Sequence, residues 1–175
     1  RVNQRGPDHD LEILSVSPPG STLPAGTSVP FLFYLRDRNG TGDMQAIQLS
    51  VLPREGSAAA PCYFRYSTLR RVIEVSYDGV EYRESQSPTT GFAGACALEA
   101  TTFQPNSTDL IFRFSLLFAG EAGETLILSV RAEDANGVPG PWVKATEMVA
   151  VNQCRALPVM DYFMYLSGGG TNNSM

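Results

Sequence analysis

The feature that most constrains the fold of this 175-residue chain is a strict alternation of apolar and polar side chains. It is clearest in the segment DLIFRFSLLF, residues 109–118, and it recurs in SVPFLFYLRD, residues 28–37, and ETLILSVRAE, residues 124–133. Successive side chains of a β-strand point to opposite faces of a sheet. The spacing therefore predicts strands that bury one face. The expected inward residues are Val29, Phe31, Phe33, Leu35, Leu110, Phe112, Phe114, Leu116, Phe118, Leu126, Leu128, Val130 and Ala132.

Shorter alternations and frequent turn signals extend this pattern over most of the chain. The weaker alternations are at Leu14 and Val16, at Ile47, Leu49 and Val51, and at Ile73, Val75 and Tyr77. Segments such as RDRNGTGD and FAGEAGE separate them, and Asn-Gly and Asp-Gly pairs favour tight hairpins. No stretch keeps a helical period for more than two turns. We therefore predict an all-β chain without substantial helix, folded as an antiparallel two-sheet sandwich of about seven to nine strands.

The two ends differ in composition from the middle. We expect residues 1–10 to be a polar arm or linker, residues 11–152 to be the sandwich, and residues 153–175 to be a separate segment with a Gly-rich end. We also expect RVNQRGPDHD to be a mature, processed start. An apolar cluster in the last segment must be covered, either by its own sandwich or by a neighbouring subunit. With Cys154, it forms a candidate intersubunit contact: Val159, Met160, Tyr162, Phe163, Met164, Tyr165 and Leu166.

The charge of the chain restricts its partners. Its 18 acidic and 13 basic residues give a net charge of −5. An acidic protein does not attract nucleic acid or an anionic membrane surface. No apolar run approaches the roughly 20 residues that a membrane-spanning helix needs. We therefore expect protein partners, copies of the chain itself among them, whereas a carbohydrate partner has no specific support.

Three cysteines, Cys62, Cys96 and Cys154, lack the spacing of a metal site. Cys62 and Cys96 each begin an alternating segment and lie on its apolar face, where a buried disulfide would fit. Two separate buried thiols fit equally well there. One disulfide with an odd thiol would indicate an oxidising compartment. Cys154 is then either an intermolecular thiol or a shielded, inert one.

Two acidic loops are the candidates for a metal or substrate site. DRNGTGD places Asp37, Asn39 and Asp43 at alternate positions, as in a calcium loop, but Gln48 stands where an EF-hand-type loop has Glu. A hairpin turning at Asn39-Gly40 is the simpler interpretation. RAEDANGVPGPW, residues 131–142, similarly predicts a strand end and a turn with solvated acids, followed by a Trp that returns to close the core.

The sequence offers little for catalysis. His9 is the only histidine, so a nucleophile and base pair would depend on the polar arm. Glu74, Asp78, Glu81 and Glu84 are close in sequence, but their spacing favours a solvated strand edge over a pair of glycosidase carboxylates. We predict no enzyme activity and no cofactor. Asn39, Asn106 and Asn172 lie in glycosylation sequons.

The order of seven segments resembles a domain that recurs in large secreted bacterial surface proteins of mostly uncharacterised function. The segments, within residues 11–151, are LSVSPPGS, YLRDRNGTGDMQAIQLSV, APCYFRY, VIEVSYDGVEY, GACALEATTF, DLIFRFSLLF and VRAEDANGVPGPW. The resemblance implies an immunoglobulin-like or fibronectin-III-like sandwich, and it favours a Cys62–Cys96 pair. It supplies no catalytic residues, and the segment after Asn152 has no counterpart.

These observations predict a non-catalytic, secreted module with a structural or adhesive role at a cell surface. A second hypothesis is a self-assembling subunit of an extracellular filament or surface layer, in which a terminal arm adds a strand to the next subunit. A third is a carbohydrate-binding or hydrolytic domain. The fold alone does not choose between them.

Overall fold

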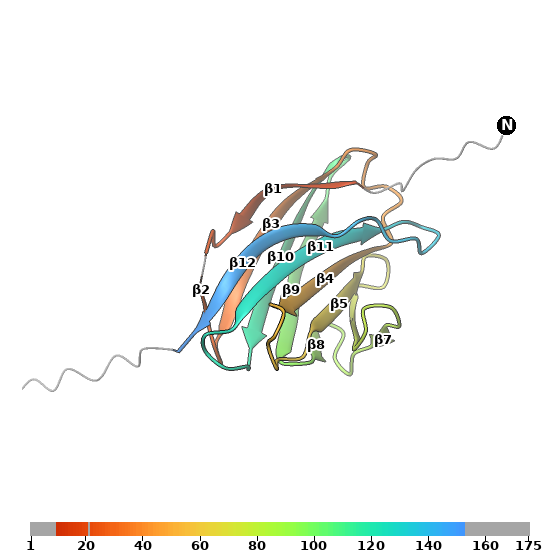
Figure 1. Ribbon diagram of the computed structural model, residues 1–175. Coiled ribbons are helices and arrows are strands. Elements are labelled where there is room, and N and C mark those ends of the chain that lie inside the picture. The colour runs from red at the N-terminus through yellow and green to blue at the C-terminus, as the bar shows by residue number, and fades with distance from the viewer. Residues whose placement is uncertain (1–9, 21, 153–175) are drawn as a thin grey trace, which may run out of the picture.

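The computed structural model describes residues 10–20 and 22–152, which form two β-sheets packed face to face (Figure 1). Sheet A has the order β1 (Leu11–Ser17), β3 (Ser28–Asp37), β10 (Asp109–Phe118), β9 (Cys96–Pro105) and β8 (Thr90–Ala93). Sheet B has the order β2 (Thr22–Pro24), β12 (Val143–Val151), β11 (Thr125–Glu133), β4 (Ala46–Pro53), β5 (Cys62–Ser67), β6 (Val72–Ser76) and β7 (Arg83–Glu84).

The predicted all-β sandwich is confirmed. Nine of the twelve strands have five or more residues, and the other three, β2, β7 and β8, are short additions to the sheets. The described ranges contain no helix, and so none that is long and apolar enough to cross a membrane.

The connections follow the immunoglobulin pattern. β1, β3, β10 and β9 take the order of strands A, B, E and D, while β12, β11, β4 and β5 take the order G, F, C and C′. The first strand is divided between the sheets, because β1 pairs antiparallel with β3 and β2 pairs parallel with β12. This arrangement is the variable-type version of the fold, with sheet B extended by β6 and β7.

The core consists of the apolar faces that the alternation predicts. All the expected inward residues of β10 and β11 are buried, as are Phe31, Phe33 and Leu35 of β3. Phe114 lies at the centre of an aromatic chain, with ring centroids 5.4 Å from Phe31, 5.1 Å from Phe33 and 5.2 Å from Phe112. Such ring pairs stabilise the fold beyond the area that they bury.

Two weaker strand predictions were partly wrong. In β1 the residues that pack on the core are Leu11, Ile13 and Val16, and not Leu14, because an irregularity in the pairing between Ile13 and Ser15 shifts which side chains face inward. Tyr77 is 82% exposed, because β6 ends at Ser76 and the alternation does not continue into the loop.

The predicted disulfide joins Cys62 of β5 to Cys96 of β9, and therefore links the two sheets, with the two Cα atoms 5.9 Å apart. In antibody domains the inter-sheet bridge joins strands B and F at the centre of the sandwich. Here it lies toward the side of the sandwich where β8 and β9 face β5 and β6.

Replacing Cys62 and Cys96 together by Ser should lower the free energy of unfolding by about 3 to 4 kcal/mol, because the open chain regains the entropy of a loop of this size. Urea denaturation followed by fluorescence measures the change. Cys154→Ser is the matched control and should leave the stability of the sandwich unchanged. Equal losses in the two variants would contradict the observed pairing.

Candidate binding cleft and its supporting network

An open cleft of about 750 Å³ lies at one end of the sandwich, where the β3–β4 loop meets the β5–β6 and β9–β10 turns. This volume lies within the range of roughly 300–1,000 Å³ typical of ligand sites. Its apolar lining comes from Met44, Tyr66, Leu69, Phe103 and Pro105, and its charged side chains are Asp43 and Arg71. Leu69 at the tip of the β5–β6 turn is 86% exposed. The cleft thus combines an apolar wall with few polar groups, as binding sites do.

The floor of the cleft is the end of the aromatic core. Tyr66 of β5 and Phe103 of β9 face each other across the two sheets with ring centroids 5.6 Å apart, and Tyr66 is 5.5 Å from Phe112. Burial raises the pKa of Tyr66, although the charge of Arg71 opposes this shift. Within residues 10–20 and 22–152, the Tyr66 hydroxyl has no hydrogen-bond partner.

Arg71 occupies an unusual backbone position beside this floor. Its φ is +56°, in the left-handed region that favours Gly and Asn, and its amide N–H donates to the carbonyl of Ser67 at 2.8 Å to close the β5–β6 turn. The side chain is exposed, and it makes no ion pair with any other residue of the described ranges. The turn therefore presents an unpaired guanidinium at the cleft.

The three segments around the cleft are tied to one another. The Thr68 hydroxyl donates a hydrogen bond that is shared by two backbone carbonyls, that of Met44 at 2.8 Å and that of Gln45 at 2.9 Å. The Thr41 hydroxyl donates to the carbonyl of Asn106. These bonds join the β5–β6 and β9–β10 turns to the β3–β4 loop, so the lining of the cleft is held in place before a ligand arrives.

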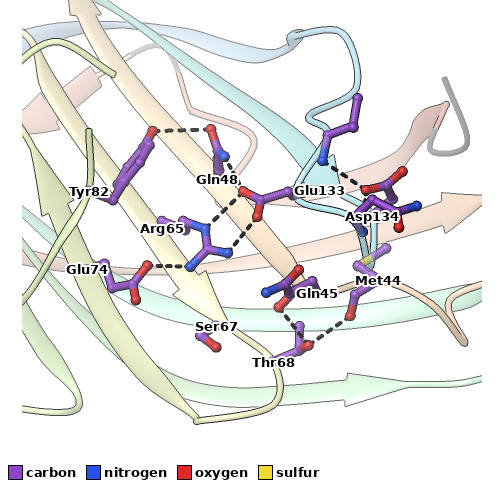
Figure 2. A network of polar contacts seen from close by, with 12 residues as sticks. Met44, Gln45, Gln48, Arg65, Ser67, Thr68, Glu74, Tyr82, Glu133 and Asp134 are labelled. Atoms are coloured by element: carbon purple, nitrogen blue, oxygen red, sulfur yellow. Dashed lines mark hydrogen bonds and ion pairs between the residues drawn. The ribbon is translucent and has the colours of Figure 1, made fainter. Parts of the chain in front are cut away.

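A row of polar side chains crosses the outer face of sheet B next to the cleft (Figure 2). Cross-strand pairing aligns one residue each from β11, β4, β5, β6 and β7: Arg131, Gln48, Arg65, Glu74 and Glu84. Aligned side chains on one face of a sheet are close enough to interact. Arg131 Nε donates to Gln48 Oε1 at 2.8 Å, and Arg65 pairs with Glu74.

Glu133, two residues along β11 from Arg131, joins this row. Arg65 holds its carboxylate with two bonds, Nε to Oε2 at 2.9 Å and a second nitrogen to Oε1 at 2.6 Å. Gln48 Nε2 donates to the same carboxylate at 2.7 Å. Burial raises the pKa of Glu133, but the hydrogen bonds from Arg65 and Gln48 and the charges of Arg65 and Arg131 outweigh it, so the pKa lies below its ordinary value.

The prediction that the acids of these segments are solvated was wrong for three of them. Glu74, Glu133 and Asp134 are each 6% exposed. The buried carboxylate of Glu133 is satisfied by Arg65 and Gln48, which are distant in sequence, so the local pattern does not show it. Glu74 pairs with Arg65 and Arg70, and Asp134 accepts backbone N–H groups of its own turn. The turn prediction itself holds: Asp134 Oδ1 accepts the N–H groups of Asn136 and Val138 at 2.8 Å, and Gly137 has a φ of +78°.

The β6–β7 loop lies over this row. The Tyr82 hydroxyl donates to Gln48 Oε1 at 3.2 Å, and burial raises the pKa of Tyr82 to about 12. The guanidinium of Arg131 donates a hydrogen bond to the backbone carbonyl of Gly79 at 3.4 Å. At Gly79 the φ is +76° and a Cβ atom would lie 2.8 Å from the Tyr63 ring, so only glycine fits.

Trp142 was expected to close the core, and this was wrong. Its ring is 37% exposed and lies on the outer face of sheet B, with the guanidinium of Arg131 4.2 Å from the ring centroid. The contact is a cation–π interaction. Pro139 and Pro141 before it are also exposed, and β12 begins at Val143.

The other predicted site residues are dispersed. Asp37 is buried and accepts the N–H of Asn39 at 2.9 Å, whereas Asp43 lies on the cleft. Asn39 and Asn106 are exposed, and Asn106 lies at the cleft rim. Within the described ranges, no group of three or more His, Cys, Asp or Glu side chains is placed to hold a metal. Cys154, Asn172 and the apolar cluster of residues 159–166 lie outside the described residues.

Sequence reasoning missed the cleft. Its lining comes from four separate segments, and no pattern within one segment predicts that they meet. One local signal was present: the turn between β5 and β6 has the sequence Thr68-Leu69-Arg70-Arg71, without Gly, Asn or Asp. An apolar residue and two cations in so tight a turn are more typical of a binding loop than of a simple connection.

Comparisons with known proteins add little. No protein-family model and no curated protein matches the sequence. Two solved structures are similar: the human CEP192 ASH/PapD-like domain (PapD-like domain 7) and a DUF4466 family protein from Parabacteroides merdae. The CEP192 domain is 7% identical, with a TM-score of 0.34, and the match covers 87% of this chain and 91% of that domain. The DUF4466 protein is 13% identical, also with a TM-score of 0.34, and the match covers 80% of this chain and 44% of that protein. At this level they support no functional conclusion.

Glu133→Gln should lower the free energy of unfolding by about 3 kcal/mol at neutral pH, because it removes one of the two carboxylates that pair with the buried Arg65. The folded-state pKa of Glu133 is depressed, so its contribution is present above the ordinary value of 4.5 and is lost as the pH falls through the lower folded value. The difference between variant and wild type should therefore shrink in acid. Glu147→Gln, which breaks an exposed pair with Lys144, is the control and should have little effect. A difference that stays constant down to pH 3 would contradict this role for Glu133.

Proposed function

We propose that this chain is a non-catalytic β-sandwich module of the cell surface, with a structural or adhesive role, that holds a partner in the end cleft. The observation that carries the proposal is the exposed Arg71 guanidinium, which forms no ion pair within residues 10–20 and 22–152, at the rim of an apolar, aromatic-floored cleft. Such a site selects a ligand with an apolar or aromatic body and one anionic group. Arg71 would bind the anion, while Tyr66, Phe103 and Leu69 would pack on the body.

The chemistry of the buried acids favours binding over catalysis. A general acid needs a raised pKa so that it carries a proton near neutral pH. Glu133 has the opposite character, because the arginines and Gln48 hold its pKa below the ordinary value. Its lone pairs are already occupied by Arg65 and Gln48. The carboxylates of this network therefore serve as structural ties between strands.

The inter-sheet disulfide supports an extracellular location. Disulfides persist in oxidising compartments and are rare in reducing ones. The Cys62–Cys96 bridge joins the two sheets within the buried core, which is the role of a structural disulfide in secreted sandwiches. The resemblance of the segment order to bacterial surface-protein domains points the same way.

The test uses 8-anilinonaphthalene-1-sulfonate, an aromatic anion, as the probe of the full chain. Saturable binding with a fluorescence increase is expected, and Arg71→Glu should weaken it by about tenfold, as for the loss of one charge-assisted bond. Asp43→Asn should strengthen it slightly, since it removes the anion from the same cleft. Arg83→Glu in β7 is the matched control and should bind like wild type. Equal binding by the Arg71 and Arg83 variants would refute the site.

A further inference from the structure

We infer that the ligand of this cleft is the segment Val159–Leu166 of another copy of the chain, so that copies join head to tail. The inference rests on the proposed binding role of the cleft and names its partner.

The first support is chemical complementarity. The segment reads VMDYFMYL, and Asp161 is its single charged residue. The cleft has an apolar lining from Met44, Leu69 and Phe103, and of its two charged side chains, Asp43 and Arg71, the exposed Arg71 forms no ion pair with another described residue. A carboxylate that meets a guanidinium can form two parallel hydrogen bonds. The neighbouring aromatic and aliphatic side chains of the segment would cover the exposed Leu69.

The second support is the direction of the chain. β12 starts at Val143, just after the β11–β12 loop that contributes Ala135 to the cleft, and ends at Val151 at the opposite end of the sandwich (Figure 1). Its nine residues span about 30 Å. Asp161 is nine residues beyond Asn152, a distance of at most about 32 Å when fully extended. To meet its own Arg71 the segment would have to run back straight along the whole sandwich, whereas the cleft of a second copy can approach the end where β12 stops.

The consequence is an open assembly. The donated segment and the receiving cleft are different surfaces, so the contact is heterologous, and a dimer still has one free cleft and one free segment. Growth then continues at both ends. This mode differs from strand addition, because the occupant enters between the sheets at the end of the core and does not pair with an edge strand.

Two charge variants of the full chain test the contact. Every chain in the experiment, wild type and control included, carries Cys154→Ser, which excludes disulfide linkage between copies. In sedimentation velocity, wild type should form a concentration-dependent series larger than a dimer. Arg71→Glu and Asp161→Arg should each weaken self-association by at least tenfold and sediment as monomers. Mixed in equal amounts, they should associate again, because the intact cleft of the Asp161→Arg chain can receive the intact segment of the Arg71→Glu chain and the two reversed charges are complementary to each other. Arg83→Glu should assemble like wild type.

Three outcomes would overturn the inference. They are a monomeric wild type, a mixture of the two variants that stays monomeric, and an Arg71→Glu chain that still assembles. A monomeric wild type whose binding of the anilinonaphthalene probe depends on Arg71 would leave the cleft as a binding site and remove only this partner. If wild type is monomeric and its binding of the probe does not depend on Arg71, the proposed function is refuted as well.

Discussion

The packing of two apolar sheet faces around Phe114 is the interaction on which the rest of the structure depends. Phe114, 1% exposed, contacts the rings of Phe31, Phe33 and Phe112 within sheet A, and Tyr66 of sheet B packs on Phe112 across the two sheets. This contact fixes which side of every strand faces inward, since the side-chain period in a strand is two. It thereby also fixes which polar side chains meet on the outer face of sheet B. The charged row and the cleft are both consequences of that register.

The two sheets differ in width, and this difference shapes the outer surface. Sheet B has seven strands and sheet A has five. The disulfide between β5 and β9 secures the additional strands of sheet B at one end, and the contact between Tyr66 and Phe103 joins the same two strands at the other. Between them, Arg65 binds acids on both sides, Glu74 on β6 and Glu133 on β11. Removing one partner of a buried ion pair of this kind is strongly destabilising, because it leaves an uncompensated charge in the interior.

Among the residues that the structure describes, the cleft is the open end of the core. The aromatic chain from Phe31 through Phe114 and Phe112 ends at Tyr66 and Phe103, which form the cleft floor. Around it, hydrogen bonds from Thr41 and Thr68 tie the loops to one another. A site formed in this way is rigid, so its ligand does not bear the entropic cost of ordering it. The exposed Leu69 and the left-handed Arg71 fit a surface maintained for contact.

The sequence by itself determined the strands, the faces that they bury and the turns between them, because alternation and Asn-Gly chemistry act over neighbouring residues. Phe112 and Phe114 could be placed in the core from DLIFRFSLLF alone. The tertiary structure alone decided the state of the charged groups. Glu133 meets Arg65, 68 positions away, only because β4 lies between β11 and β5 in the sheet order. The cleft likewise arises from segments far apart in the chain. Strand order and register are long-range properties, and no local spacing of residues encodes them.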